Sequence, residues 1–442
     1  MIKKMPKYES YKDSCEQWIG DIPAHWEVYR LKSAVYECSN GIWGSDPNGR
    51  DEIVVLRVAD FDDHKLKISD EKLTYRSIPA KERLGRLLKN GDLLIEKSGG
   101  GDKTLVGRVV LFDKQYPAVT SNFVAKMTPK EWVISGFLKY VFSALYNNGV
   151  NYLSIKQTTG IQNLDASSYL NEKFCIPQKE EQYEIAKFLD NKTTQINEAI
   201  AIKQKQIELL KERKQIIIQQ AVTQGLNPDA PMKDSGVDWI GEIPEHWGIV
   251  RFKNLFTQSR LPVRKGDDVV TSYRDGQVTL RSNRRVGGYT EAILEGGYQG
   301  IRKGQLVLNS MDAFEGAIGV SDSDGKCTPE YVICDPINSV DVSQYYFAYL
   351  LREMALAKYI QVICNAVRQR AVRIRYNNLA PLFMVVPPVK EQEDIVSFIE
   401  KESTKLDAGT KHLNEQISKL KEYKTTLINS VVTGKIKVTE LA

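Results

Sequence analysis

Basic and amide side chains gather in four short segments of this sequence. Four arginines fall within residues 368–375, and the segments 97–103, 157–163 and 281–285 combine basic or amide residues with Ser, Thr or Gly. Arg, Gln and Asn can read guanine and adenine edges through paired hydrogen bonds, whereas Lys and backbone amides suit phosphates. A solvated loop is the competing interpretation of any single residue, and the density of arginine at 368–375 argues against it there. We expect DNA contacts from the following residues: Lys97, Ser98, Lys103, Thr159, Gln162, Asn163, Arg281, Arg284, Arg285, Arg368, Gln369, Arg370 and Arg373.

The sequence lacks the constellations that catalysis on DNA would need. An adenine methylase requires an Asn/Asp-Pro-Pro-aromatic motif, but Val389 follows the one Pro-Pro pair, Pro387-Pro388. The Glu-x-Lys triplets at 212–214 and 422–424 have no aspartate beside them to help hold a metal. No Gly-x-x-x-x-Gly-Lys-Ser/Thr phosphate loop occurs. We therefore expect a chain that does no chemistry itself and holds no metal or cofactor of its own.

Composition is that of an ordinary globular chain. Its 442 residues are 42% hydrophobic and 26% charged, with a net charge of +5, a mild excess that permits a nucleic-acid partner without requiring one. The six cysteines are scattered and none forms a Cys-x-x-Cys pair. No apolar run approaches the roughly 20 residues that cross a bilayer, and the first residues do not resemble a signal peptide. We expect a reduced, cytoplasmic protein with no membrane partner.

Two stretches of the sequence recur, which indicates an internal duplication. Trp-Ile-Gly-Asp-Ile-Pro-Ala-His-Trp at 18–26 returns as Trp-Ile-Gly-Glu-Ile-Pro-Glu-His-Trp at 239–247. A second match runs without a gap over 181–223 and 391–433. The histidine of the first motif has no repeated Ser, Cys or Asp beside it, so we expect a packed strap rather than a catalytic group. The motif follows the first helical stretch but opens the chain, as in a circularly permuted repeat, and we expect the termini to lie near each other.

Heptad spacing within the second stretch predicts two long helices. The seams are Ile196, Ile200, Ile207, Leu210, Ile217 and Ala221, and Leu406, Leu413, Ile417, Leu420, Leu427 and Val431. Lys214 and Lys424 occupy the same seam position, where like charges would meet in a parallel pair, so antiparallel packing is favoured. A homodimeric zipper and two unrelated core helices are the alternatives. The seam from Thr193 to Ala221 spans roughly 43 Å, close to the ~34–36 Å between same-face major grooves of DNA.

The inserts between the recurring stretches align only loosely, and each mixes strand-like runs with a helix. Strands are expected at 53–58 and 105–112 in the first insert, with a helix over 136–146. In the second insert we expect strands at 305–308 and 317–320 and a helix over 343–359. The predicted fold class is α+β: two tandem recognition domains separated by two long antiparallel coiled-coil helices, as a pseudo-two-fold internal repeat. The predicted segments are 1–26 (conserved start), 27–177 (first recognition domain), 178–225 (central helix), 226–247 (linker with the repeated motif), 248–387 (second recognition domain) and 388–442 (C-terminal helix).

The constant stretches resemble those of the specificity subunit of type I restriction–modification systems. The Trp-Ile-Gly-x-Ile-Pro-x-His-Trp motif opens each unit, and Ile176-Pro177 or Pro387-Pro388, followed by Glu-Gln, opens each helix. The resemblance implies two target-recognition domains that read the halves of a split double-stranded DNA site. It also implies two adenine-N6 methylase subunits docked on the conserved regions, together with restriction and translocase subunits. S-adenosylmethionine, ATP and magnesium would belong to those partners.

The family pattern includes a Gly-Ser/Thr-x-Gln-x-Leu-like stretch near the end of each recognition domain. Residues 159–164 match it loosely, whereas 367–370 depart further. The competing hypothesis is a coiled-coil scaffold whose two variable domains bind proteins. That hypothesis accounts for the helices but not for two divergent inserts that carry Arg and Gln at a DNA-turn spacing.

Overall fold

The computed structural model describes residues 5–100, 104–158, 160–284, 297–338, 341–363 and 373–438. The chain forms two compact units, one of residues 1–205 with 413–442 and the other of residues 206–412. Each unit therefore combines one variable insert with parts of both long helices. Among the described residues, no helix has both the length and the apolar character needed to cross a bilayer.

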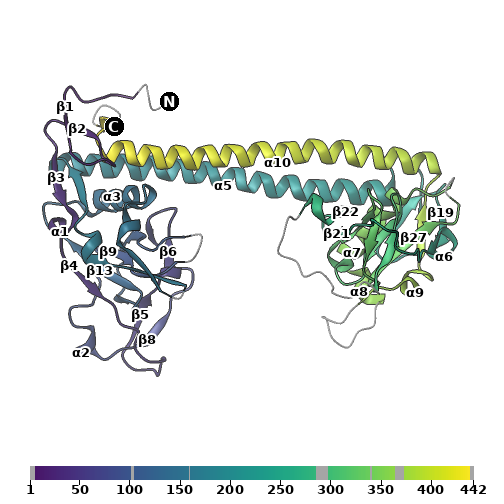
Figure 1. The fold of residues 1–442 in the computed structure, drawn as a ribbon, viewed down its shortest axis with the longest axis horizontal. Coiled ribbons are helices and arrows are strands. Elements are labelled where there is room, and N and C mark those ends of the chain that lie inside the picture. The colour runs from purple at the N-terminus through teal and green to yellow at the C-terminus, as the bar shows by residue number, and fades with distance from the viewer. Residues whose placement is uncertain are drawn as a thin grey trace. The chain divides into compact units, whose positions relative to one another are not determined.

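A six-stranded sheet carries the core of the first unit, and Figure 1 labels its strands β4, β13, β9 and β6. Its order is β4 (Val35–Asn40), β13 (Val124–Pro129), β9 (Leu93–Glu96), β11 (Val109–Leu111), β7 (Lys67–Ile68) and β6 (Phe61–Asp62). Smaller sheets comprise β12 (Ala118–Thr120), β5 (Glu52–Leu56) and β8 (Tyr75–Ser77), and β10 (Ser98–Gly99), β15 (Ile161–Leu164) and β14 (Ile155–Thr158). Helix α3 (Ser135–Asn147) buries its apolar face between this sheet and the long helix α5 (Lys179–Gln224).

The second unit repeats four neighbouring strands of this sheet, β4-β13-β9-β11, in the same order. The four counterparts are β20 (Phe256–Gln258), β27 (Tyr331–Pro336), β24 (Leu306–Asn309) and β25 (Ile318–Val320). Two hairpin-like pairs add β21 (Val270–Ser272) with β22 (Val278–Leu280), and β23 (Gln299–Ile301) with β26 (Gly325–Cys327). All three neighbour pairs of the four strands are antiparallel, as in β4-β13-β9-β11 of the first unit. The mixed helix and sheet content confirms the predicted α+β class.

One helix of the second unit is shorter than predicted. The pattern over 343–359 predicts a continuous helix, but α7 (Gln344–Leu356) ends before Lys358, and α8 (Tyr359–Ile363) follows. Lys358 has φ 61°, a left-handed backbone that cannot continue a right-handed helix. The spacing of apolar residues could not predict this break, because α7 and α8 both bury apolar side chains and the apolar pattern continues across it.

The segment that contains the Trp-Ile-Gly motif, which we call the strap (residues 11–30 and 232–251), pairs with the last strand of each insert in the same manner. In the first unit β3 (Glu27–Arg30) pairs with β16 (Lys173–Ile176), and in the second β19 (Gly248–Arg251) pairs with β28 (Phe383–Val386). The tryptophans Trp26 and Trp247 are fully buried. The remaining short strands of the strap are β1 (Tyr11–Asp13) with β2 (Asp21–Pro23), and β17 (Met232–Asp234) with β18 (Glu242–Pro244). Short helices α1 (Leu31–Ala34), α2 (Ala80–Arg83), α4 (Ala166–Tyr169), α6 (Phe252–Leu255) and α9 (Tyr376–Leu379) complete the two inserts.

Sequence-distant ends meet in the first unit. Lys437 donates a backbone hydrogen bond of 2.9 Å to the carbonyl of Pro6, which confirms that the two ends of the chain lie close together. Gly434 packs against Pro23 of the strap, just as Gly225 packs against Pro244 and Trp247 in the second unit. The C-terminal helix thus meets the N-terminal copy of the motif as the central helix meets the second copy, which is the relationship expected of a permuted repeat.

The two long helices run for 46 residues (α5) and 44 residues (α10, Val389–Val432). In the first unit Lys203 contacts Gln416, and Asn197 accepts a 3.0 Å hydrogen bond from Lys424. In the second unit Lys214 forms a 2.7 Å ion pair with Asp407. As the residue number rises along α5 it falls along α10, so the helices pair antiparallel within each unit. The two lysines that would have met in a parallel pair each have a different partner.

Candidate DNA interface

The loop after β9 carries the first pair of predicted contact residues. Lys97 donates its backbone N–H to the carbonyl of Phe123 (2.8 Å) and accepts from the backbone N–H of Leu164 (2.8 Å). The bond from Leu164 continues the pairing of β10 with β15. The Ser98 hydroxyl consequently donates to Asn163 Oδ1 at 2.5 Å, so two residues 65 apart in sequence form one exposed polar pair.

Lys97 and Gln162 lie on either side of this pair and differ in exposure. Lys97 Nζ is exposed and donates to Asn40 Oδ1 at 2.7 Å. The Gln162 side chain is only 5% exposed, and its Oε1 accepts from the backbone N–H of Val106 at 3.1 Å. Strand β15 alternates its side chains and turns Gln162 inward, where its amide supports the loop. The DNA contact that the sequence predicts from Gln162 stays a prediction.

A cavity of about 630 Å³ lies beside the Ser98–Asn163 pair. Its wall includes Trp43, Phe123, Ile161, Ser98, Ser121 and Asn122. Phe123 is 56% exposed, and the buried hydroxyl of Ser121 has no hydrogen-bond partner among the described residues. Apolar walls with a few polar groups are typical of ligand-contacting concavities.

A partly buried ion pair lines this cavity. Glu96 accepts from Arg108 Nε at 2.8 Å, and Arg108 also pairs with Asp63 at 2.5 Å. Burial lowers the pKa of Arg108, but the hydrogen bonds and charges of Glu96 and Asp63 outweigh this and raise it. The guanidinium therefore stays charged and holds the base of the loop in place.

The second unit builds the same loop from different side chains. Ser310 donates its backbone N–H to the carbonyl of Glu330 (3.2 Å), and its own carbonyl accepts from the backbone N–H of Ile374 (3.2 Å). These two hydrogen bonds correspond to those of Lys97. Arg373 precedes Ile374 as Asn163 precedes Leu164. The Arg373 guanidinium donates to Glu330 Oε1 at 2.7 Å and reaches Met311 Sδ at 4.0 Å.

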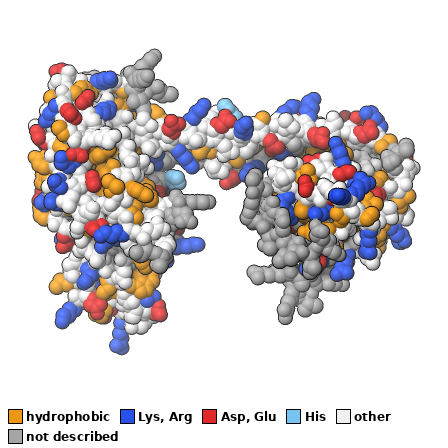
Figure 2. All heavy atoms as spheres, in the orientation of Figure 1, with side chains coloured by type: hydrophobic (Ala, Val, Ile, Leu, Met, Phe, Trp, Pro, Cys, Tyr) orange, Lys and Arg blue, Asp and Glu red, His pale blue; other side chains and the backbone are white. Residues whose placement is uncertain are grey.

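Arg281 and Arg284 occupy another surface of the second unit, at the end of β22. Arg281 Nε donates to Thr271 Oγ1 at 3.3 Å. Arg284 forms a 2.8 Å ion pair with Asp275 and lies over the Tyr273 ring, 4.2 Å from its centroid. The predicted contacts Lys103, Thr159, Arg285, Arg368, Gln369 and Arg370 lie outside the described residues. On the face shown in Figure 2, the basic and acidic side chains of the described residues are interspersed in each unit.

Sequence reasoning missed the residues that surround the predicted contacts. Phe123, Met311 and Glu330 carry no local motif, and they reach the loop only through strand pairing. The alignment of Gly91 with Gly304, just before β9 and β24, could have located Met311, because it places Ser98 opposite Met311.

Each motif histidine pairs with the glutamate that begins the long helix. His25 Nε2 lies 3.0 Å from Glu181 Oε2, and His246 Nε2 lies 2.8 Å from Glu391 Oε2. In the first unit Tyr8 also donates its hydroxyl to Glu181, and its pKa is raised by burial and by this bond. In each unit this contact joins the Trp-Ile-Gly motif to the start of the long helix, the two stretches that recur in the sequence. It therefore supports the expected structural role of the motif.

Comparison with known proteins identifies a class for this architecture. A family model described as the type I restriction modification DNA specificity domain matches residues 67–211. The type I restriction enzyme EcoBI specificity subunit of Escherichia coli is 21% identical over 345 residues, covering 72% of this chain and 70% of that protein. The MjaVIII specificity subunit of Methanocaldococcus jannaschii is 28% identical over 169 residues, covering 38% of this chain and 36% of that protein.

Solved structures share the fold at low sequence identity. A chain from a study of assembly and conformational transition of the type I R-M system has a TM-score of 0.66 at 14% identity, covering 93% of this chain and 98% of that one. The HsdS subunit from Thermoanaerobacter tengcongensis has a TM-score of 0.52 at 14% identity, covering 94% and 98%. The first three curated relatives are covered over 54%, 36% and 39% of their own lengths, so the chain spans about half or less of each. The chain is therefore similar in sequence to type I restriction enzyme specificity subunits and shares the fold of solved chains from such systems.

Proposed function

We propose that this chain is the sequence-specific DNA-binding subunit of a type I restriction–modification complex. It reads a bipartite double-stranded site with its two inserts and does no chemistry itself. The observation that carries this proposal is the repeated loop: the backbone bonds of Lys97 and Ser310 match, while the side chains they present differ. A conserved scaffold with different side chains at one position suits two domains that read two different half-sites.

The duplicated strap supports a pair of identical partners. His25–Glu181 and His246–Glu391 have the same geometry in the two units. We assign this constant surface to the docking of two methylase subunits, with restriction and translocase subunits joining the assembly. S-adenosylmethionine, ATP and magnesium belong to those partners, which explains why the sequence carries no motif for them.

The paired helices act as a spacer between the half-sites. Their antiparallel contacts within each unit, such as Lys214 with Asp407, suit the expected pseudo-two-fold repeat, in which the same pairing of helices accompanies each recognition domain. A spacer of this kind sets the number of base pairs between the two sequences that are read.

The test is sequencing of adenine methylation in host DNA with and without the gene. We expect a split adenine-methylated motif that disappears when the gene is deleted. The competing coiled-coil scaffold predicts no change in methylation. Binding of the purified complex to DNA should also weaken steeply between 50 and 200 mM salt; a flat response would refute the DNA hypothesis.

A further inference from the structure

Arg373 and Asn163 occupy the same position in the loops of the two units. Arg373 precedes Ile374, whose backbone N–H donates to the carbonyl of Ser310 in the loop after β24. Asn163 precedes Leu164, whose backbone N–H donates to the carbonyl of Lys97 in the loop after β9. At the next residue of each loop, Met311 contacts Arg373 as Ser98 contacts Asn163. The equivalence rests on hydrogen bonds, so it holds although the two inserts align only loosely in sequence.

Strand pairing extends the equivalence to a third position. Val124 pairs with Glu96 in the first unit, and Tyr331 pairs with Asn309 in the second. The residues before these partners, Phe123 and Glu330, are therefore equivalent. The first unit presents Ser, Asn and Phe around its loop, whereas the second presents Met, Arg and Glu.

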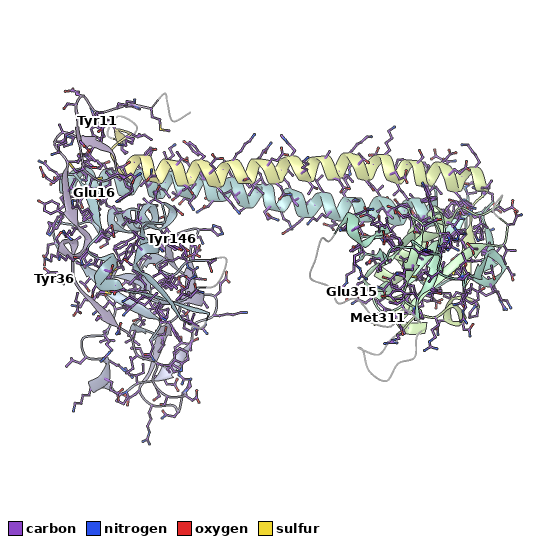
Figure 3. All side chains as sticks on the ribbon, viewed as in Figure 1. Tyr11, Glu16, Tyr36, Tyr146, Met311 and Glu315 are labelled. Atoms are coloured by element: carbon purple, nitrogen blue, oxygen red, sulfur yellow. The ribbon has the colours of Figure 1, made fainter. Side chains whose placement is uncertain are left out.

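The side chains of the second unit form an exposed, oriented group. Arg373 and Glu330 are 44% and 40% exposed and make a 2.7 Å ion pair. Met311 is 53% exposed and lies at one edge of the unit together with Glu315 (Figure 3). Glu330 occupies one guanidinium nitrogen of Arg373, and the remaining N–H groups have no oxygen acceptor among the described residues.

We propose that Arg373 reads a guanine in the half-site of the second unit, by donating to its O6 and N7 atoms while Glu330 orients the guanidinium. This inference rests on the proposed function and names the chemistry of one contact in it. Arg with guanine is the commonest specific pairing in the major groove. Asn163 at the same position of the first unit has an amide, which is complementary to adenine.

The carboxylate of Glu330 distinguishes a base from a phosphate as the target. A phosphate bound by Arg373 would lie next to Glu330 and be repelled by its negative charge. The major-groove edge of guanine is neutral and offers two acceptors, so it avoids this repulsion. The exposed thioether of Met311 likewise suits a base edge better than a charged backbone.

The test compares methylation motifs in cells that carry the wild-type gene or Arg373→Ala, with the whole complex present. We expect one position of one half-site to become degenerate, that position being G·C in the wild type, with a loss of discrimination of about 5- to 150-fold. The other half-site should stay unchanged, which shows that the variant folds and assembles. Glu330→Ala should relax the same position to a smaller extent.

Arg264→Ala provides a matched control. Arg264 also makes an exposed ion pair, with Asp324 at 3.5 Å, but it lies at the opposite end of β24, where Lys303 donates its backbone N–H to the same Asp324. Cells that carry Arg264→Ala should show the same methylated DNA motif as cells that carry the wild-type gene.

Three results would overturn the inference. A uniform fall in methylation with an unchanged motif would make Arg373 a phosphate contact. Relaxation at a position that is A·T in the wild type, or in both half-sites, would show that a different base is read. Absence of any gene-dependent split motif in the wild type would refute the proposed function first, and this contact with it.

Discussion

The amide oxygen of Gln182 accepts a 2.8 Å hydrogen bond from the backbone nitrogen of Ile134, and so ties the start of α5 to the start of α3. The Gln182 Nε2 group donates to the carbonyls of Trp132 (3.2 Å) and Pro177 (3.0 Å). In the second unit Gln392 makes the corresponding bonds to Ser343, Asp341 and Pro387. The repeated glutamine therefore joins the recognition domain to the long helix in both halves.

Replacing this glutamine should destabilise one unit. Gln182→Ala leaves three backbone groups without their partner at a side chain that is 1% exposed, and we expect a loss of about 3 kcal/mol in the free energy of unfolding. Gln392→Ala should cost about the same in the second unit. Denaturant unfolding measures both, with the exposed neighbour Glu180→Ala as the control, expected within about 0.5 kcal/mol of wild type. Equal effects of Glu180→Ala and Gln182→Ala would contradict this role.

Glu353 should make the stability of the second unit depend on pH. Burial raises its pKa from 4.5 to about 7, although a hydrogen bond from Gln215 and the charge of Arg352 oppose the shift. Because the folded pKa lies above the unfolded one, the favourable contribution of Glu353 is complete below about pH 4.5 and is lost as pH rises through 7. Glu353→Gln should match the wild type at low pH and exceed its stability by about 2–3 kcal/mol above pH 7.

Thermal unfolding between pH 4 and 8 checks this prediction. Glu315→Gln is the control, because its side chain is exposed and pairs with Arg274 at the surface. A difference between Glu353→Gln and wild type that stays constant over this pH range would refute it.

A methyl group on Gly225 should weaken the junction between α5 and the second strap. Gly225 has φ +78°, and an added Cβ would lie 3.0 Å from Glu391 Oε1 and 3.2 Å from Trp247 Cζ2. The left-handed backbone alone costs an alanine about 1 kcal/mol or more, and the contact would displace the partner of His246. Calorimetry should show a lowered Tm for Gly225→Ala. Gly266→Ala is the control, since it shares a positive φ but meets no atom within 4 Å; equal losses would assign the effect to the backbone alone.

Lengthening the helix pair should lengthen the spacer of the recognised site. Seven residues inserted between Gln204 and Gln206, matched by seven between Asn414 and Gln416, add two turns and about 10 Å to the pair. That corresponds to about 3 base pairs of DNA. Methylation sequencing should show the same half-sites with a longer spacer, whereas the insertion in α5 alone should impair assembly. An unchanged spacer in the double insertion would show that the helices do not set it.

Exchange of one insert should change one half of the site. Residues 27–175 replaced by the corresponding insert of another family member should alter one half-site of the methylated motif, because the two inserts lie in separate units. The half-site read through residues 248–385 should persist unchanged. A new sequence in both halves would show that the domains do not read independently.

The repeat, the two long helices and their antiparallel direction could all be predicted from residue spacing. Heptad spacing predicts the helices because it reflects the local geometry of a helix. The lysine at the same seam position in both copies predicts the antiparallel direction, because like charges would meet in a parallel pair. The strap and the buried tryptophans also followed from residue type, since two large apolar rings within one short motif require a packed environment.

The grouping of side chains on a shared surface could not be predicted without the fold. Ser98 and Asn163, or Met311, Glu330 and Arg373, come together through strand pairing between distant segments, and no local spacing encodes that register. The same register turned Gln162 inward, although its residue type suits a base contact. Each motif histidine also finds its glutamate partner about 150 residues away, because the strap and the long helix of each copy meet only when the unit has folded.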